Sequence, residues 1–272
     1  MKAKTCVVVS HWVARSTTNL HRLLRQMTRV EAGSPFDLII VCNGGDENPY
    51  TLPPAFDRLC ARVLNRENTG LNIGAWEHGW RAAGGYEAYL FLQDECFLKK
   101  PGWVSEFEFR MGSDPGIGLL GESIMWDRMS WSYIRTATDR DLGSGWFEGE
   151  SVHPLDAYQA FLLRRGIDPG PVGTHLQSLI WFTREEILRE IGGLPTGVSY
   201  REAVACEIAL SRLIESRGYR ISKVKDRPFE LIGHRQWTAT DRFKRDTRRR
   251  VAFFLKGLGF RRRRRIGETT AT

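Results

Sequence analysis

The sequence predicts an α/β fold, built on a mainly parallel sheet with helices on both faces. Short apolar runs alternate along the 272-residue chain with segments of helical periodicity, and polar turns follow the apolar runs. Hydrophobic residues make up 42% of the chain and charged residues 26%, as in soluble globular proteins. The longest apolar runs have four or five residues, whereas a membrane-spanning helix needs about 20.

The first part of the chain supplies three strands and two helices. Residues 5–9 and 37–42 are apolar runs that indicate buried strands, and residues 62–64 indicate a third. Leucine and methionine recur at helical spacing over 17–27, and a second helix is expected over 73–83. In sheets of this type, ligands bind beyond the carboxyl ends of the strands. The polar segments after these strands are therefore candidate binding loops.

The pattern resumes further along the chain. Residues 89–92 and 179–182 indicate buried strands, and a helix over 184–191 ends at the pair Gly192-Gly193. A helix over 207–214 and a strand over 219–224 follow. These elements complete one domain over residues 1–235.

Residues 121–175 differ from the rest of this domain, because Trp and Tyr occur there among Gly, Asp and Arg. One interpretation is an irregular, partly helical insertion with its own small core. The other is a surface that faces the substrate, on the acceptor side.

A basic tail follows the domain over residues 236–272. Its segment 241–265 holds 12 Lys and Arg and two Asp, a net charge of +10, and Glu268 contributes −1. Because the whole chain has a net charge of +8, residues 1–240 sum to about −1. The body is therefore close to neutral, and the positive charge is a property of the tail.

The five cysteines, at positions 6, 42, 60, 96 and 206, form no CxxC pair and are odd in number. This pattern predicts neither a disulfide framework nor a zinc site. It favours a protein of the reducing cytosol. The N-terminal residues lack the apolar core of a secretory signal.

Two adjacent carboxylates, Asp94 and Glu95, follow the strand at 89–92. Carboxylate oxygens at a strand end can hold a divalent cation, which can in turn bind a diphosphate. The alternative is an ordinary acidic turn.

A third carboxylate, Glu207, begins the predicted helix over 207–214. It could accept a proton from an attacking hydroxyl. Alternatively, it only complements the helix dipole.

Two further turns carry polar residues and glycines. One is Val41-Cys42-Asn43-Gly44-Gly45-Asp46, and the other begins Glu67-Asn68-Thr69-Gly70 and continues to Ala75. Gly70 and Gly74 permit positive φ or close backbone approach. Either turn alone could be only a tight loop.

Taken in order, these four segments resemble the family 2 glycosyltransferases of the GT-A fold, which are inverting enzymes that use nucleotide-sugar donors. The Val-Asp-Asn-Gly-Ser-like turn of the family falls on residues 41–46 and its Asn-x-Gly on 68–70. Its Phe-Leu-Asp-Asp-Asp turn falls on 91–95, and its Glu-Asp-x-Asp-Leu-Ser stretch falls on 206–211. The resemblance covers about residues 4–225. The segment from Asn68 to Ala75 also resembles transferases of rhamnan assembly.

The resemblance implies a GT-A domain with a nucleotide-sugar donor and a divalent metal, Mg²⁺ or Mn²⁺. In this resemblance, Glu207 takes the position of the catalytic base and Glu95 that of the metal ligand. His234 is a second candidate metal ligand, because some GT-A enzymes place a His late in the chain. The residues implied in donor binding are Ser10, Cys42, Asn43, Asp46, Asn68, Gly70 and Asp94.

Four positions depart from the family pattern. Cys42 replaces an Asp that helps to hold the base, and Glu207 replaces the usual catalytic Asp. In the metal turn, Gln93 replaces the first Asp and Glu95 the last. A domain that binds nucleotides or carbohydrates without catalysis is therefore the alternative function.

The tail places Phe243, Val251, Phe254, Leu255 and Leu258 along one stripe of a helix, with basic residues on its other faces. Such a helix can lie in an anionic membrane surface. We therefore expect a cytoplasmic enzyme at the inner face of the membrane, with a saccharide or lipid-linked saccharide as its acceptor. Alternatively, the stripe packs on the body, or the basic run binds nucleic acid. Nucleic acid is not expected, because the body has neither a basic face nor a recognisable binding motif.

Overall fold

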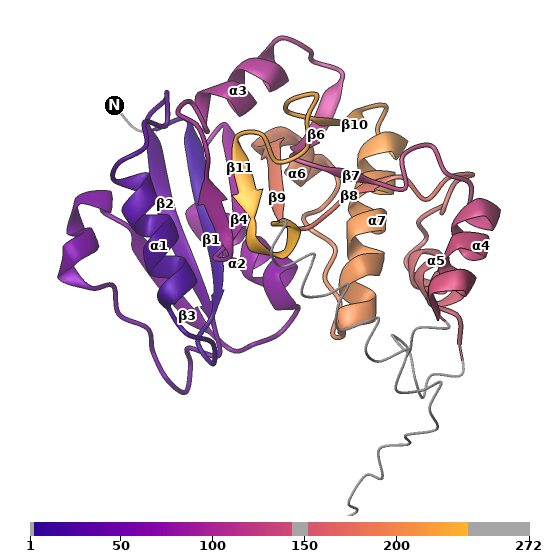
Figure 1. Ribbon diagram of the computed structural model, residues 1–272, viewed down its shortest axis with the longest axis horizontal. Coiled ribbons are helices and arrows are strands. Elements are labelled where there is room, and N and C mark those ends of the chain that lie inside the picture. The colour runs from indigo at the N-terminus through magenta and orange to yellow at the C-terminus, as the bar shows by residue number, and fades with distance from the viewer. Residues whose placement is uncertain (1–2, 143–151, 239–272) are drawn as a thin grey trace, which may run out of the picture.

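The computed structural model describes residues 3–142 and 152–238 (Figure 1). The amphipathic helix expected over 241–265 lies outside these residues, as does the part of the 121–175 segment from 143 to 151. No helix in the described parts of the chain has both the length and the apolar character needed to cross a bilayer.

A seven-stranded mixed sheet forms the centre of the fold, in the order β10-β6-β9-β4-β1-β2-β3 (Figure 1). Neighbouring strands run parallel except for β9, which is antiparallel to both β4 and β6. The strands of this sheet are β1 (Thr5–Trp12), β2 (Phe36–Asn43), β3 (Arg62–Arg66), β4 (Ala88–Gln93), β6 (Ile117–Gly121), β9 (Ile180–Arg184) and β10 (Arg220–Lys223). The expected mainly parallel sheet is confirmed, and β9 is its one reversed strand in the described residues.

Helices cover both faces of this sheet. Apolar side chains of β1 point alternately to the two sides, so that Val7 and Val9 belong to one core cluster and Val8 to the other. The first cluster includes residues of α1 (Thr18–Met27), α3 (Ser105–Gly112) and the 3-10 helix η1 (Pro54–Leu59). The second includes residues of α2 (Leu71–Ala83), α5 (Pro154–Arg164), α6 (Glu185–Glu190) and α7 (Tyr200–Ser216).

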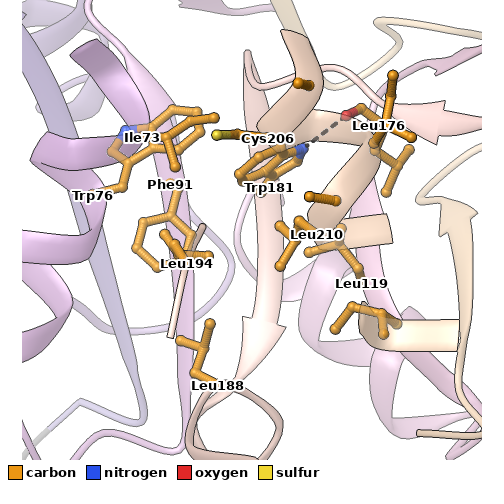
Figure 2. Close-up of a cluster of buried hydrophobic side chains, with 14 of the residues drawn as sticks. Ile73, Trp76, Phe91, Leu119, Leu176, Trp181, Leu188, Leu194, Cys206 and Leu210 are labelled. Carbon is orange, nitrogen blue, oxygen red and sulfur yellow. Dashed lines mark hydrogen bonds between the residues drawn. The ribbon is translucent and has the colours of Figure 1, made fainter. Parts of the chain in front are cut away.

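Large aromatic side chains fill the core between β4, β9, α2 and α7 (Figure 2). The rings of Trp76 and Trp181 lie 5.2 Å apart and are both fully buried. Each indole N–H still finds a backbone acceptor. Trp76 donates to Leu92 O at 3.0 Å, and Trp181 donates to Leu176 O at 3.3 Å (Figure 2). These bonds connect the core to the ends of β4 and β8 (His175–Leu176), where the polar residues gather.

The aromatic segment over 121–175 contains regular structure in its described part. It has the short strands β7 (Ile124–Met125) and β8, which pair with each other, and the helices α4 (Trp131–Leu142) and α5. Figure 1 shows α4 and α5 beyond α7, on the side away from the central sheet. Ile134, Leu155 and Tyr158 of this segment are buried in the same cluster as α7. The segment therefore extends the core of the domain instead of forming a separate one.

The helix that carries Glu207 begins earlier than the sequence pattern indicates. It starts at Tyr200, and its N-cap Ser199 accepts a hydrogen bond from Glu202 N at 3.2 Å through its hydroxyl. Glu207 lies two turns inside the helix as a result. Its interpretation as an acidic residue that complements the helix dipole at the N-terminus is therefore wrong.

Near the end of the described chain, β11 (Ile232–His234) pairs antiparallel with β5 (Cys96–Leu98). His234 stands opposite Cys96 in this pairing. The carboxylate Glu122 fixes the approach to β11, because it accepts the backbone N–H groups of Glu230, Leu231 and Ile232 at 2.8, 3.1 and 2.7 Å. Residues up to 138 positions apart in the chain are brought together in this way, and β11 ends next to the acidic turn. The 3-10 helix η2 (Arg235–Trp237) follows directly.

Candidate active site

A cleft of about 890 Å³ opens where β1, β2 and β4 end, and α7 forms its opposite wall. It contains most of the polar residues singled out from the sequence, although they lie up to 197 positions apart. The predicted residues that line it are Ser10, Asn43, Asn68, Asp94, Glu95 and Glu207. The carboxylates after β4 and the carboxylate on α7 therefore face one space.

Four predicted residues do not line this cleft. Cys42 is fully buried, and burial raises the pKa of its thiol to about 12, so that the group stays neutral. Asp46 is exposed in the turn after β2. Gly70 caps the start of α2 with φ of +72°, and a Cβ there would lie 2.9 Å from Gly74 Cα. His234 is buried behind the acidic turn.

Asn43 holds the loop that leads into α2. Its Nδ2 donates to Leu71 O at 2.8 Å, and its Oδ1 accepts from the Arg66 guanidinium at 2.9 Å. Arg66 also donates to Thr69 O at 2.9 Å. Because both ends of the Asn43 amide are engaged, this side chain orders the cleft wall.

Asp94 is held by a histidine that the sequence motifs do not include. His11, the residue before the last of β1, has its Nδ1 2.6 Å from Asp94 Oδ2 and its side chain is fully buried. A carboxylate only accepts, so Nδ1 donates, and in the neutral ring Nε2 is then an acceptor. In the described structure, this Nε2 has no hydrogen-bond partner. Both residues line the cleft, and Nε2 is an acceptor of a kind that a bound ligand could satisfy.

Glu95 follows at the mouth of the same turn. Its Oε1 lies 3.4 Å from the Arg15 guanidinium, and its Oε2 lies 3.8 Å from His234 Nε2. Within residues 3–142 and 152–238, no three His, Cys, Asp or Glu side chains are grouped as ligands for a metal ion. Mg²⁺ is commonly held by one or two carboxylates together with substrate phosphates and water. The pair Asp94 and Glu95 fits a metal shared with a diphosphate, not one held by the protein alone.

His234 is neutral in this environment, because burial lowers the pKa of its imidazole to about 4. Its Nδ1 accepts from Gln236 N at 3.2 Å, so Nε2 carries the proton and donates to Gln93 Oε1, also at 3.2 Å. Ligation of a metal by His234 stays a prediction from the sequence. It would require these two hydrogen bonds to change.

Glu207 is anchored on one of its two oxygens. Oε1 accepts two hydrogen bonds of 2.6 Å from Ser178, one from the backbone N–H and one from the hydroxyl. Among the described residues, Oε2 has no such donor, and it lies 3.5 Å from His175 Nε2. The side chain of Glu207 remains 13% exposed, into the cleft. Oε2 is therefore the oxygen that is available to a substrate.

The tautomer of His175 follows from its other contact. Nδ1 lies 2.8 Å from Gly173 O, and because a carbonyl only accepts, Nδ1 carries the proton. In the neutral ring, Nε2 then has a lone pair directed at Glu207 Oε2. A proton between these two atoms would make a favourable bond, and this arrangement suits a carboxylate that receives a proton.

Aromatic residues form the wall of the cleft beside Glu207. Trp126, Tyr158 and Tyr200 line it, and the Trp126 ring meets the His175 ring at 5.0 Å in an edge-to-face arrangement. Trp126 has φ of +51°, a conformation that is costly for a residue other than glycine and that is enriched at functional sites.

His11, His175 and Ser178 were not singled out from the sequence as site residues, and Trp126 only as part of the 121–175 segment. His11 could have been found, since the segment after the strand at 5–9 was expected to lie at the binding edge. Ser178 could not, because it precedes a strand, and the rule that ligands bind at carboxyl ends holds for parallel strands. Since β9 is antiparallel to β4, Ile180 pairs with Leu92, and the start of β9 reaches the cleft.

Comparison with known proteins supports the fold. No known family profile matches the chain, and neither does any curated protein sequence. Among solved structures, a mannosyltransferase from Pyrobaculum calidifontis in complex with GDP-Man and Mn²⁺ has a TM-score of 0.52 at 14% identity, over 96% of this chain and 66% of that chain. The chain thus spans about two thirds of that protein. This likeness shows that the chain has the GT-A fold.

Two further structures match less well. Glucosyl-3-phosphoglycerate synthase from Mycobacterium tuberculosis, solved with Mn²⁺, UDP and phosphoglyceric acid, has a TM-score of 0.48 at 15% identity, over 96% of this chain and 80% of that chain. Staphylococcus aureus TarS, residues 1–349, has a TM-score of 0.48 at 12% identity, over 93% of this chain and 65% of that chain.

Proposed function

We propose that the protein is an inverting glycosyltransferase, which moves a sugar from a nucleotide-sugar donor to an acceptor hydroxyl with the help of a divalent metal. The observation that carries this proposal is the single cleft shared by the acidic turn and the carboxylate of α7. The mannosyltransferase with the same fold was solved with a nucleotide sugar and Mn²⁺. That its ligands also belong to this chain is part of the proposal.

The donor is placed over the ends of β1 and β2, near Ser10, Asn43 and Asn68. Asp94 and Glu95 would hold Mg²⁺ or Mn²⁺, which when bound supplies positive charge for the leaving diphosphate. Arg15, beside Glu95 on the cleft wall, adds a guanidinium to the same end. His11 keeps Asp94 in place through its Nδ1–H.

Glu207 acts as the base. The acceptor hydroxyl gives its proton to Oε2 while its oxygen bonds to the anomeric carbon, and the nucleoside diphosphate leaves from the opposite face. One displacement inverts the configuration of the sugar. His175 Nε2 can then accept a hydrogen bond from the protonated Oε2, 3.5 Å away. Ser178 keeps Oε1 occupied throughout.

The acceptor is placed along the aromatic wall of Trp126, Tyr158 and Tyr200, because flat rings suit the apolar faces of sugars. A saccharide or a lipid-linked saccharide is therefore the proposed acceptor, in polysaccharide or glycolipid assembly. The basic segment 241–265 would bring the enzyme to the anionic inner face of the membrane from the cytoplasm. The rhamnan type remains a prediction from residues 68–75.

A thermal-shift panel tests this function first. UDP, GDP, dTDP and CMP would each be added with and without Mn²⁺ to the full chain, since a ligand that binds only the folded state raises its melting temperature. We expect one nucleotide to give a metal-dependent shift that is lost in Glu95→Ala. Glu87→Ala, which removes an exposed carboxylate paired with Lys4 outside the cleft, is the control and should keep the shift.

The anomeric configuration of the product, followed by NMR with the donor identified in this way, then tests inversion. Retained configuration would contradict the role given to Glu207. Nucleotide binding without turnover of any donor would favour the non-catalytic binding domain. The absence of any shift in well-folded full-length protein would contradict the transferase and favour a domain that binds carbohydrate without catalysis.

A further inference from the structure

Gln93 stands where the resembling family has the first carboxylate of its metal turn, and its side chain is used for a different purpose here. It ends β4 and lies next to Asp94. The Nε2 of its amide donates to Ser178 O at 2.6 Å, and its Oε1 accepts from His234 Nε2 at 3.2 Å. The amide therefore connects the end of β4 with the start of β9 and the end of β11.

Ser178 is the junction in this network. Its carbonyl accepts from Gln93 and also from Asn72 Nδ2, at 2.7 Å, and its N–H and hydroxyl donate to Glu207 Oε1. Only 4% of Ser178 is exposed, so water does not replace these partners easily. A displacement of Ser178 would move both anchors of Glu207 at the same time.

We propose that Gln93 is a positioning residue for the base, and this inference rests on the proposed function. Through Ser178, Gln93 keeps Glu207 Oε1 occupied and leaves Oε2 directed at the acceptor and His175. An amide is suited to this role because it donates and accepts at once, whereas a carboxylate would only accept and would repel Ser178 O. Displacement of a catalytic group by about 1 Å can reduce turnover about 10²-fold.

The test compares three substitutions in the full chain. Gln93→Glu keeps the length of the side chain but removes the donor to Ser178, and Gln93→Met removes both polar atoms at similar volume. The matched control is Gln26→Glu. Gln26 on α1 also bridges to backbone, with Nε2 donating to Leu98 O at 3.3 Å and Oε1 accepting from Leu98 N at 2.9 Å, but it does not line the cleft.

Donor turnover, measured with water or sugar as acceptor, is the first readout. We expect Gln93→Glu and Gln93→Met to lower kcat about 10²-fold, while KM for the donor and the metal-dependent thermal shift change less than about twofold. Gln26→Glu should leave kcat unchanged. If Gln93 were instead a weakened metal ligand, Gln93→Glu would strengthen the metal-dependent shift and keep or raise kcat, and this result would overturn the proposal.

The amide proton of Ser178 in NMR spectra is a second readout that needs no activity. A hydrogen bond of 2.6 Å to a carboxylate should place this proton downfield and slow its exchange. We expect the signal to shift in Gln93→Glu, in Gln93→Met and in Glu207→Gln, and to stay in place in Gln26→Glu.

The two readouts fail separately. If the wild-type chain binds no nucleotide and turns over no donor, the proposed function fails, but the Ser178 signal still reports the connection to Gln93. If this signal is the same in the wild type and in both Gln93 variants, the positioning role is overturned even when the enzyme is active.

Discussion

Glu207→Gln separates the chemical role of Glu207 from its structural one. The amide is nearly isosteric with the carboxylate, and its Oε1 can still accept from the N–H and hydroxyl of Ser178, which lie 2.6 Å away in the wild type. Its NH₂ group would then take the place of Oε2, where it can donate to His175 Nε2. The substitution therefore preserves the contacts of the side chain and removes its ability to accept a proton.

The magnitudes of the two effects differ. Hydrogen bonds to a charged acceptor are stronger than those to a neutral one, so we expect a loss of about 1 kcal/mol in the free energy of unfolding. General base catalysis contributes about 10²- to 10⁴-fold to a rate. At about 1.4 kcal/mol for each factor of ten, this corresponds to roughly 3–5.5 kcal/mol in activation free energy. The catalytic effect should exceed the structural effect several-fold.

The assay is donor turnover at saturating donor and Mn²⁺, alongside urea unfolding of the same protein. Glu202→Gln is the control, since Glu202 lies on the same helix, outside the cleft wall, and accepts from Val198 N at 2.7 Å through Oε2. It should lose a similar amount of stability and keep its kcat.

Wild-type turnover in Glu207→Gln would refute the assignment of Glu207 as base. So would an equal loss of kcat in Glu202→Gln, because the effect would then belong to the helix as a whole.

Two further predictions concern stability. Burial raises the pKa of the Glu122 carboxyl from 4.5 to about 7, against the opposing effect of the backbone N–H groups that it accepts. Between pH 4.5 and about 7, the folded protein therefore keeps the proton of Glu122, whereas the unfolded chain has lost it. The protonated Glu122 stabilises the fold fully below pH 4.5, and this stabilisation is lost as the pH rises through about 7. In urea titrations, the free energy of unfolding of the wild type should fall on the order of 3 kcal/mol across this window relative to that of Glu122→Gln. A difference between the two proteins that does not change with pH would contradict the raised pKa of Glu122. Trp181→Ala should lower the free energy of unfolding by about 3–5 kcal/mol, because a fully buried indole is removed from the core. Trp181→Phe should lower the free energy of unfolding by about 1–3 kcal/mol, mainly because Leu176 O loses its hydrogen-bond donor. Calorimetry that ranked the two variants in the opposite order would show that the hydrogen bond matters more than the packing.

Much of the first half of the fold was predictable from the sequence. The strand expected at 5–9 is β1, residues 5–12, and the helix expected over 17–27 is α1, residues 18–27. The strand expected at 37–42 and the helix over 73–83 are confirmed as β2 and α2. These elements are strongly periodic or continuously apolar, so local composition alone indicates them.

Other elements are not marked by a local sequence pattern. Helix α3 carries only two buried residues, Phe107 and Met111, among charged ones, so its periodicity is weak. The first five residues of α7, Tyr200 to Val204, are exposed or half-buried. No apolar periodicity therefore marks where this helix begins. The strand β11 is three residues long and is stabilised by partners far away in the chain, so no local pattern marks it.

The sequence by itself determined the type of fold, the acidic turn at Asp94 and Glu95, and Glu207 as a candidate base, because short-range patterns and residue chemistry carry this information. Only the tertiary structure decided how these groups are completed. The reversed direction of β9 brings Ser178 to Glu207, the end of β1 brings His11 to Asp94, and β8 brings His175 to the same Glu207. Strand direction and side-chain pairing across many residues depend on packing of the whole domain, which no local pattern in one sequence contains.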